Sequence, residues 1–355
     1  MTLRVGVIGV GAIGQDHIRR LTHVISGARV VALTDVDAQR AQSAAGSLDG
    51  ARVHATGQDL IDDGDVDAIL VTSWGPTHEE YVLASIAAGK PVFCEKPLAP
   101  TPDACLRIVK AEVARGQRLV QVGFMRRYDA GYRAMKKGLA RGTLGAPLLA
   151  HCAHRNPTAP PYGFTSEMMI SDSAVHEIDI VRWLFDQEIA AGTVLKPRRT
   201  TLGDPNLQDP LIMILEMADG VVVDVEVFVN CGYGYDIRCE VVAESGTVAL
   251  SDGGEIVITS NGLHSRPVPA DWRERFVRAY DVELQEWVEA VSAGDASGPS
   301  SWDGYAAAAV VERCLEALQS GQRSTVQLED RPELYRTPGG TNAVEQSTEG
   351  HRASR

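Results

Sequence analysis

The first third of the chain alternates apolar runs with segments of helical periodicity. Short runs rich in β-branched residues are typical of buried parallel strands. Helical spacing of apolar positions follows the first run, and a second helix is predicted over 76–88. This alternation predicts an α/β protein that begins with a Rossmann domain, a doubly wound parallel sheet between helices. We expect six strands in that sheet, near residues 4–9, 29–34, 51–55, 67–73, 91–95 and 119–124.

After about residue 125 the apolar pattern changes to a period of two. Valines alternate with Asp224 and Glu226, so one face of this strand should be covered while the other could be a subunit interface. Long helices are predicted over 270–293 and 302–320, and the second should pack back against the first domain. A C-terminal α+β domain with a large, mostly antiparallel open sheet is predicted from strands at 147–153, 193–197, 210–217, 220–229, 236–243, 246–251 and 254–259.

A glycine-rich turn joins the first predicted strand to the first predicted helix. Gly9 permits the tight turn, Gly11 lets a phosphate approach the backbone, and Gly14 allows the helix to pack closely on the strand. The N-terminus of that helix favours an anion. Asp35 ends the second strand at the spacing of an acidic residue that binds a ribose diol and repels a ribose phosphate. The pattern favours NAD over NADP and over a turn without a ligand, while Arg40 nearby keeps NADP as an alternative.

Ligands of such sheets bind beyond the carboxyl ends of the strands. Four loops at those ends, residues 9–14, 35–37, 72–78 and 95–97, should therefore face one crevice. Lys96, within the Glu-Lys-Pro tripeptide, should point to the place of the nicotinamide. The predicted cofactor-binding residues are Gly9, Gly11, Ala12, Ile13, Gly14, Asp35, Ser73, Trp74, His78, Glu95 and Lys96.

Composition limits the classes of function. The 355 residues include 34 basic and 47 acidic ones, and the net charge of −13 argues against binding of nucleic acid or an anionic membrane. The six cysteines form no CxxC pair, so we expect a reduced cytoplasmic protein without a metal site. Cys94 is expected to be a buried strand residue, and His151 and His154 are expected to be structural.

The segment 168–186 predicts a helix that carries chemistry at its start. Ser171 or Asp172 can cap this helix. Asp172 and His176 are four residues apart, and Asp179 follows three residues later, so carboxylates should flank the imidazole on both sides. Such carboxylates can fix the tautomer and shift the pKa of His176 toward proton transfer. A helix cap and a satisfied buried histidine are the alternative, and Lys96 favours the catalytic interpretation because a cation stabilises a developing alkoxide.

Several motifs together carry a resemblance to a known family. They are GVGAIG at 9–14, Glu-Lys-Pro at 95–97, GFMRRYD at 123–129 and the helix start at 172–176. From about residue 3 to residue 330 the chain resembles the superfamily of glucose-fructose oxidoreductase, inositol dehydrogenase and rhizopine catabolism enzymes. Within it, the chain is most similar to bacterial inositol 2-dehydrogenases, judging by the segments 154–157, 171–179 and 234–247.

The resemblance implies roles for individual residues. Lys96, Asp172 and His176 would form the catalytic set, with His176 taking the hydroxyl proton as a hydride leaves for the nicotinamide. Lys96 would bind the reacting oxygen and Asp172 would orient the other two. The implied substrate-binding residues are Lys96, Asn156, Asp172, His176 and Asp179, with Tyr235 and Tyr280 as weaker candidates that could equally be packing aromatics.

The function expected from these residues is NAD-dependent oxidation of a secondary hydroxyl of a cyclic polyol, myo-inositol to 2-keto-myo-inositol. The alternatives are scyllo-inositol or another sugar or polyol as substrate, and a non-catalytic, nucleotide-sensing regulator of the same fold. The resemblance also suggests a homotetramer. We expect an NAD-binding domain over 1–125, a domain for substrate binding and oligomerisation over 126–336, and a disordered tail over 337–355.

Overall fold

The N-terminal part of the chain folds around a six-stranded parallel sheet in the order β3-β2-β1-β4-β5-β6. In this computed structural model, residues 2–161, 163–251, 258–260, 263–265 and 267–336 are described. The order of the strands is that of a doubly wound dinucleotide-binding fold, as predicted. The strands are β1 (Leu3–Ile8), β2 (Ala28–Thr34), β3 (Arg52–Val53), β4 (Ala68–Val71), β5 (Val92–Glu95) and β6 (Val120–Gly123).

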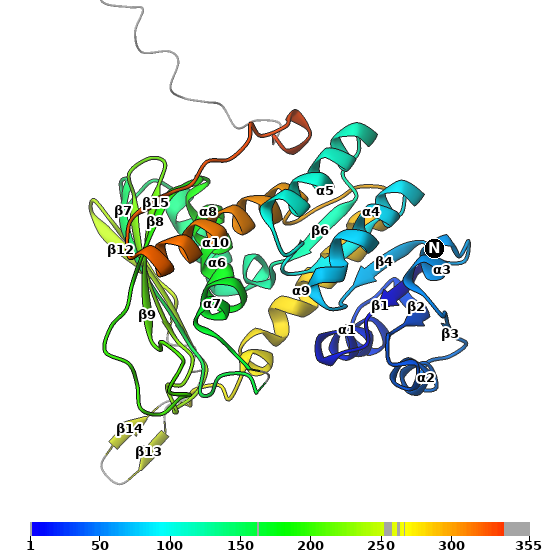
Figure 1. Cartoon of the computed structure of the whole chain (residues 1–355), viewed down its shortest axis with the longest axis horizontal. Coiled ribbons are helices and arrows are strands. Elements are labelled where there is room, and N and C mark those ends of the chain that lie inside the picture. The colour runs from blue at the N-terminus through cyan, green and yellow to red at the C-terminus, as the bar shows by residue number, and fades with distance from the viewer. Residues whose placement is uncertain (1, 162, 252–257, 261–262, 266, 337–355) are drawn as a thin grey trace, which may run out of the picture.

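Helices separate these strands along the chain and cover the sheet (Figure 1). Thr56 and Thr101 cap the starts of α3 and α5 with their side-chain oxygens. The helix predicted over 76–88 begins with a short 3-10 turn, η1 (Gly75–Thr77), and continues as α4 (His78–Ala88). The other helices here are α1 (Ala12–His23), α2 (Ala38–Ala45), α3 (Gly57–Asp62) and α5 (Pro102–Arg115).

The second sheet has seven strands in the order β12-β11-β7-β10-β9-β8-β15. Its neighbouring strands are antiparallel except for β7 and β10, which run parallel. Val223, Val225 and Val227 of β10 are buried while Asp224 and Glu226 are half-buried on the opposite face, which confirms the predicted alternation. The strands are β7 (Pro147–Arg155), β8 (Ile189–Leu195), β9 (Leu211–Met217), β10 (Val222–Phe228), β11 (Asp236–Ala243), β12 (Gly246–Ala249) and β15 (Ser324–Thr325).

Two sequence expectations about this sheet need correction. The strand expected at 193–197 begins earlier, at Ile189, directly after Glu188, whose carboxylate is held by Arg182 at 2.6 Å. The strand expected at 254–259 falls largely on residues outside those described. Its described end is β13 (Ile258–Ser260), which pairs with β14 (Leu263–Ser265) in a separate two-stranded sheet. The predicted tail over 337–355 also lies outside the described residues.

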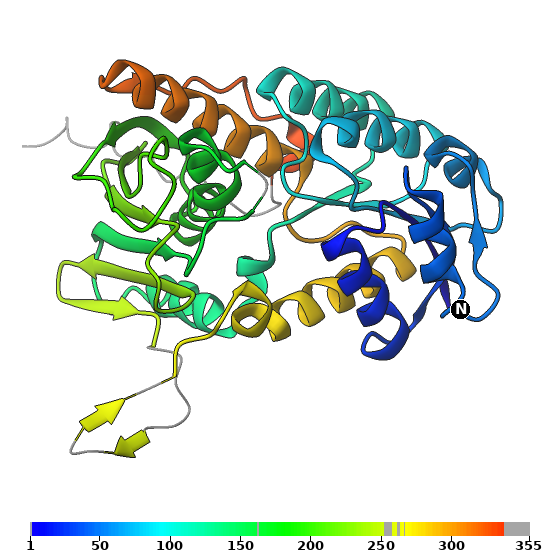
Figure 2. The ribbon, with the colours of Figure 1, turned by 60° about the horizontal axis from the view of Figure 1, so that its bottom comes forward.

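Helices pack between the second sheet and the first domain, so one face of that sheet is covered (Figures 1 and 2). They are η2 (Met125–Tyr128), α6 (Ala130–Ala140), α7 (Ser166–Met168), η3 (Met169–Ala174) and α8 (Val175–Phe185), joined by α9 (Trp272–Ser292) and α10 (Ser301–Ser320); a 3-10 turn, η4 (Glu333–Tyr335), follows β15.

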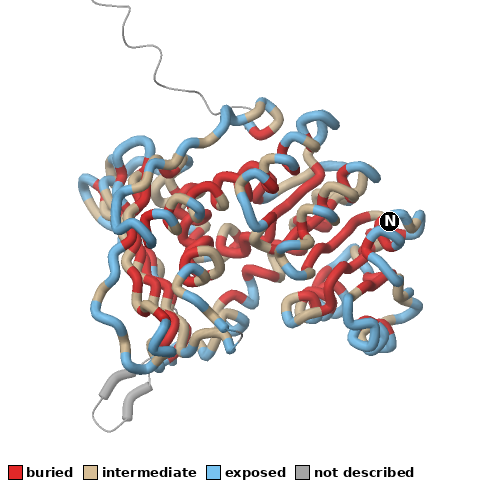
Figure 3. Tube along the Cα trace, in the orientation of Figure 1, coloured by how far each residue is buried: buried red, intermediate tan, exposed pale blue. Residues whose placement is uncertain are grey.

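The two long C-terminal helices join the domains. Trp287 and Leu284 of α9 share a core with strands of the parallel sheet. Helix α10 packs on α5 and β8 at once, which confirms the expected return to the first domain. Figure 3 shows buried residues in both sheets and in these helices, and one core cluster contains residues of both sheets and of α10. No helix in the described ranges is long and apolar enough to cross a membrane.

Candidate active site

A cavity of about 880 Å³ lies at the carboxyl ends of the parallel strands and reaches the second domain. Ten of the eleven predicted cofactor-binding residues line it, and the remaining one is Gly14. Six of the seven predicted substrate-binding residues line the same cavity, and the remaining one is Asp179. The fold therefore brings nearly all of the predicted site residues to one place.

The glycines of the first turn each have a distinct surrounding. A Cβ on Gly9, whose φ is +96°, would lie 2.5 Å from the backbone of Ser73. A Cβ on Gly14 would lie 2.2 Å from the carbonyl oxygen of Gly9, so this glycine serves the contact between α1 and the turn that the sequence predicted for it. A Cβ on Gly11 would meet no described atom within 4 Å, because Gly11 faces the open cavity.

Asp35 is fixed at the end of β2 by two backbone groups. Its Oδ2 accepts a hydrogen bond from the amide of Val10 at 2.6 Å, and its Oδ1 accepts one from the amide of Asp37 at 2.8 Å. Arg40 approaches Oδ2 at 3.8 Å and also lines the cavity. The carboxylate is thus held at the cavity wall, next to the glycine turn, with one guanidinium beside it.

The loops after β4 and β5 are tied together by His78. Its Nδ1 lies 2.7 Å from the carbonyl oxygen of Pro97, and its Nε2 lies 2.9 Å from the carbonyl oxygen of Ser73. Burial lowers the pKa of His78, so the ring is neutral at pH 7 and its one N–H donates to one of these two carbonyls. Trp74 extends from the same loop, and its side chain is 77% exposed at the cavity. His78 therefore holds together the two loops, after β4 and β5, that form part of the cavity wall.

Lys96 and Asp172 meet at the inner end of the cavity. The Nζ of Lys96 lies 3.1 Å from the carbonyl oxygen of Asp172 and 3.2 Å from its Oδ1. The expectation that Ser171 or Asp172 caps a helix is wrong: helical structure begins at Ser166, and Thr165 is the cap. Asp172 instead lies in the π-helical segment η3, a wider turn that is frequent at functional sites.

His176 is the second residue of α8 and lines the cavity. Its Nδ1 is buried and has no hydrogen-bond partner among the described residues, so Nε2 is the nitrogen that a ligand can reach. Burial lowers the pKa of His176 well below its usual 6.5, and the positive charges of Lys96 and Arg126 lower it further. At neutral pH the imidazole is therefore uncharged and able to accept a proton.

Asp179 does not flank His176 as the sequence suggested. Its carboxylate is buried and binds the guanidinium of Arg127 at 2.5 and 2.9 Å, and it is not among the residues that line the cavity. Arg127 also reaches Asp303 of α10 at 2.9 Å. Residues three apart on a helix can meet, but a guanidinium from another element offers a carboxylate a stronger, two-pronged bond. The structure thus makes Asp179 a link between η2, α8 and α10.

A buried group of three charged or polar side chains was missed by sequence reasoning. Glu177 binds Arg126 and lies 2.9 Å from Nδ1 of His154, whose ring also lines the cavity. Burial raises the pKa of Glu177, but Arg126 and then His154 outweigh it and hold this pKa at about 2. The contact with Glu177 agrees with the structural role expected for His154, and the ring also lies at the cavity wall. Arg126 and Glu177 lie on elements that are far apart in the chain and meet only in the fold, so the sequence gave no signal for this pair.

Three further predicted residues line the substrate end of the cavity. The Oδ1 of Asn156 is buried and has no partner within the described ranges. Its backbone is held by Phe228 and Cys231, so the amide is presented from a fixed position. Tyr235 and Tyr280 line the cavity and also pack in a buried aromatic cluster. Their position therefore agrees both with the substrate-binding interpretation and with the packing interpretation.

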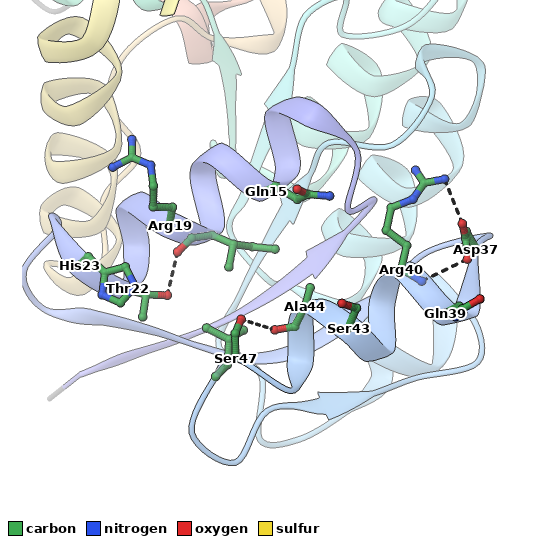
Figure 4. A pocket seen from close by; sticks show the side chains of 12 residues that line it. Gln15, Arg19, Thr22, His23, Asp37, Gln39, Arg40, Ser43, Ala44 and Ser47 are labelled. Carbon is green, nitrogen blue, oxygen red and sulfur yellow. Dashed lines mark hydrogen bonds and ion pairs between the residues drawn. The ribbon is translucent and has the colours of Figure 1, made fainter.

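A second hollow of about 700 Å³ lies between α1 and α2 (Figure 4). Its polar side chains are mostly satisfied within their own helices. Thr22 donates to the carbonyl of Ile18, Ser47 donates to that of Ala44, and Arg40 pairs with Asp37. Because these groups do not converge on a common point in Figure 4, the hollow is a groove between two helices.

Metals and reactive thiols are not part of the site as described. No cluster of three or more metal-ligating side chains occurs within the described ranges. All six cysteines are free. Burial, with Glu95 beside it, raises the pKa of Cys94 well above that of a free thiol, which confirms it as a buried strand residue and not a nucleophile.

Two family models match this chain. One describes an oxidoreductase family with an NAD-binding Rossmann fold and matches residues 3–124, and the other describes the C-terminal alpha/beta domain of an oxidoreductase family and matches residues 136–328. The chain belongs to this oxidoreductase family. It is the superfamily of glucose-fructose oxidoreductase, inositol dehydrogenase and rhizopine catabolism enzymes, so the resemblance drawn from the motifs is confirmed.

Members of this oxidoreductase family include proteins similar over nearly the whole chain. Inositol 2-dehydrogenase 3 of Saccharopolyspora erythraea is 59% identical over 96% of this chain and 100% of its own length. Inositol 2-dehydrogenase of Ralstonia nicotianae is 53% identical over 95% and 100%, respectively. A crystal structure of myo-inositol dehydrogenase from Lactobacillus casei, in complex with NAD(H) and myo-inositol, has a TM-score of 0.92 and 38% identity, and covers 95% of this chain and 100% of that one.

Proposed function

We propose that this protein oxidises a secondary hydroxyl of a cyclic polyol with NAD, converting myo-inositol to 2-keto-myo-inositol. The observation that carries the proposal is that Lys96 and His176 line the same cavity as the glycine turn and Asp35. A redox cofactor site and a proton-accepting site thus open into one space. Relatives named inositol 2-dehydrogenase support the choice of substrate.

The residues of the first domain fit NAD. The free space over Gly11, at the N-terminus of α1, suits a pyrophosphate, which the helix dipole favours. The fixed carboxylate of Asp35 can accept hydrogen bonds from a ribose diol and repels a ribose phosphate, which favours NAD over NADP. When bound, NAD supplies the hydride acceptor.

The protein groups handle the proton and the developing charge. His176, uncharged at neutral pH, accepts the proton of the reacting hydroxyl at Nε2. Lys96 donates a hydrogen bond to the same oxygen and stabilises its negative charge as the proton leaves. Asp172 orients Lys96 with two oxygens, one from its backbone and one from its side chain. As the carbon gives up its hydride, the oxygen becomes that of a ketone.

Other polar groups orient the remaining hydroxyls. The free Oδ1 of Asn156 can accept a hydrogen bond from a substrate hydroxyl. His154, fixed through its Nδ1 by Glu177, is suited to present its other nitrogen to a second hydroxyl. Tyr235 and Tyr280 close the pocket with their rings. Asp179 acts from a distance, by holding Arg127 behind this wall.

A panel of substrates tests the proposal. Purified protein is given NAD or NADP with a concentration series of myo-inositol, scyllo-inositol or glucose, and NADH or NADPH formation is followed by absorbance. We expect kcat/KM to be highest for myo-inositol with NAD. A higher kcat/KM for scyllo-inositol or glucose would make that compound the substrate in place of myo-inositol. If no polyol reduced NAD, the alternative of a nucleotide-sensing regulator would be favoured.

We also propose a homotetramer located in the cytoplasm. The face of the second sheet that no helix covers carries Asp224 and Glu226, which pair with His151 and Arg155 on the neighbouring strand. A broad, half-buried face with internally paired charges is suited to bury against another subunit. The free cysteines support a reducing compartment. Light scattering of the purified protein tests the assembly, and a monomer mass would overturn it.

A further inference from the structure

A carboxyl group with no assigned task lies buried behind the cavity. Glu283 of α9 is fully buried, and neither of its side-chain oxygens has a hydrogen-bond partner in the part of the chain that the structure describes. A buried carboxyl without a partner costs free energy that folding must offset, and native proteins rarely leave one so. The proposed reaction does not use this group.

The ring of His17 is a second unsatisfied group in the same region. His17 is fully buried, with its ring centroid 5.8 Å from that of Phe93 and 5.7 Å from that of Tyr280. Its Nε2 lies 2.7 Å from Oε1 of Glu95, while its Nδ1 is buried and has no partner among the described groups. Tyr280 and Glu283 are three residues apart on α9, so they lie on one face of that helix, toward His17.

The hydrogen-bonding capacities of these groups match. Glu95 accepts the backbone N–H of Lys96 at Oε2 over 3.2 Å, so its carboxylate acts as an acceptor and His17 donates to it from Nε2. A neutral imidazole that donates at Nε2 has a lone pair at Nδ1 and needs a donor there. Burial, and then the charge of Glu95, raise the pKa of Glu283 well above that of a free carboxyl. The shift favours the protonated form of Glu283, in which the carboxyl is an O–H donor.

Charged groups near Glu283 are already engaged elsewhere. Arg20 binds Asp16 and reaches Asp281 at 3.1 Å with its Nε. Asp179 is held by Arg127. Among the described residues, Nδ1 of His17 therefore still lacks a donor and the carboxyl of Glu283 still lacks a partner.

We propose that Glu283 donates a hydrogen bond through one internal water molecule to Nδ1 of His17, and that this relay positions Glu95 and the backbone of Lys96. A water suits the place because each of the two groups lacks a direct partner, and buried waters typically bridge such groups. The inference rests on the proposed function, in which Lys96 binds the reacting oxygen. Glu283 and His17 are positioning residues, since they act through Glu95.

The carboxylate of Glu95 is packed tightly, so it has little room to keep its position if the relay is lost. A Cβ on Gly123, in the neighbouring strand β6, would lie only 2.9 Å from Oε2 of Glu95. The carboxylate therefore fits against the β6 backbone on one side and His17 on the other. If His17 turned or shifted, Glu95 and the start of the Lys96 loop would shift with it.

Three variants separate positioning from general stability. Glu283→Gln keeps an N–H donor of similar shape, Glu283→Leu removes the donor, and Glu289→Leu makes the same change at an exposed position of the same helix. We expect Glu283→Leu to lower kcat about tenfold to a hundredfold, as small misplacements of a reacting group do, with the Kd for NAD and the melting temperature nearly unchanged. Glu283→Gln should restore most of kcat. Wild-type kcat in Glu283→Leu, or equal loss in the Gln and Leu variants, would overturn the relay.

A crystal structure of the unliganded wild-type protein tests the same relay without turnover. We expect an ordered water at about 3 Å from both a carboxyl oxygen of Glu283 and Nδ1 of His17. Electron density without such a water, or with Glu283 bound to another group, would refute the inference. If wild-type protein oxidised no polyol, the proposed function would fail while this observation would still decide the relay.

Discussion

Gly11, in the turn after β1, and Gly14, in the first turn of α1, offer a sharp test of the cofactor site. A methyl group at Gly11 would point into the cavity and meet no described protein atom within 4 Å, whereas a methyl group at Gly14 would lie 2.2 Å from the carbonyl oxygen of Gly9. Gly11→Ala should therefore fold normally, and Gly14→Ala should not. The same chemical change thus acts on binding at one position and on folding at the other.

The magnitudes follow from these surroundings. In Gly11→Ala the methyl group occupies the approach of the pyrophosphate and removes about one charged hydrogen bond, worth about 1.5–3 kcal/mol. That loss corresponds to an increase in the Kd for NAD of about 10-fold to 150-fold. In Gly14→Ala the overlap must be relieved by moving backbone, which costs about 1–3 kcal/mol of folding free energy.

Two measurements check this pair. Calorimetric titration gives the Kd for NAD, and thermal unfolding followed by circular dichroism gives the stability of each variant against wild type. We expect Gly11→Ala to keep its melting temperature and lose affinity, and Gly14→Ala to melt several degrees lower. If Gly11→Ala bound NAD as tightly as wild type, the space over Gly11 would not be the place of the pyrophosphate and the reasoning would be refuted.

Further predictions concern specificity, pH and stability. Asp35→Ser should raise kcat/KM for NADP relative to NAD, because Arg40 remains while the repelling carboxylate is gone; an unchanged ratio in steady-state assays would contradict this. The lowered pKa of His176 keeps the proton-accepting form down to lower pH, so kcat/KM for the polyol should begin to fall only below pH 6.5; a midpoint above that value would be inconsistent. Asp303→Asn leaves Arg127 without one buried partner and should lower the free energy of unfolding in urea by about 3–5 kcal/mol; a loss below about 1 kcal/mol, the size of an exposed pair, would contradict it.

The sequence was sufficient for features that depend on local pattern. The alternation of strands and helices predicted a doubly wound parallel sheet of six strands, and the structure has this sheet. The glycine spacing, Asp35 and Lys96 were predicted to meet because the carboxyl ends of parallel strands share one edge. The alternation around Asp224 gave the correct inner and outer faces of β10.

Features that depend on distant partners could not be predicted. Asp179 is three residues from His176, yet it binds Arg127, which a helical spacing rule cannot foresee. Asp172 lies in a π-helical turn, while the sequence there resembles an ordinary helix start. The contact between His154 and Glu177 spans 23 residues of the chain, so no local pattern indicated it. The pairings of Asp179 and His154 share a cause, because each depends on tertiary contacts between residues that are distant in the chain.

The central claim is that Lys96 and His176 act on a polyol hydroxyl in the cavity that also holds NAD. It is tested most directly by measuring NADH formation from saturating myo-inositol for wild type, Lys96→Ala and His176→Ala, together with the Kd for NAD of each. The account predicts turnover by wild type only, with NAD affinity largely kept in both variants. Near-normal turnover in either variant, or none in wild type, would contradict it.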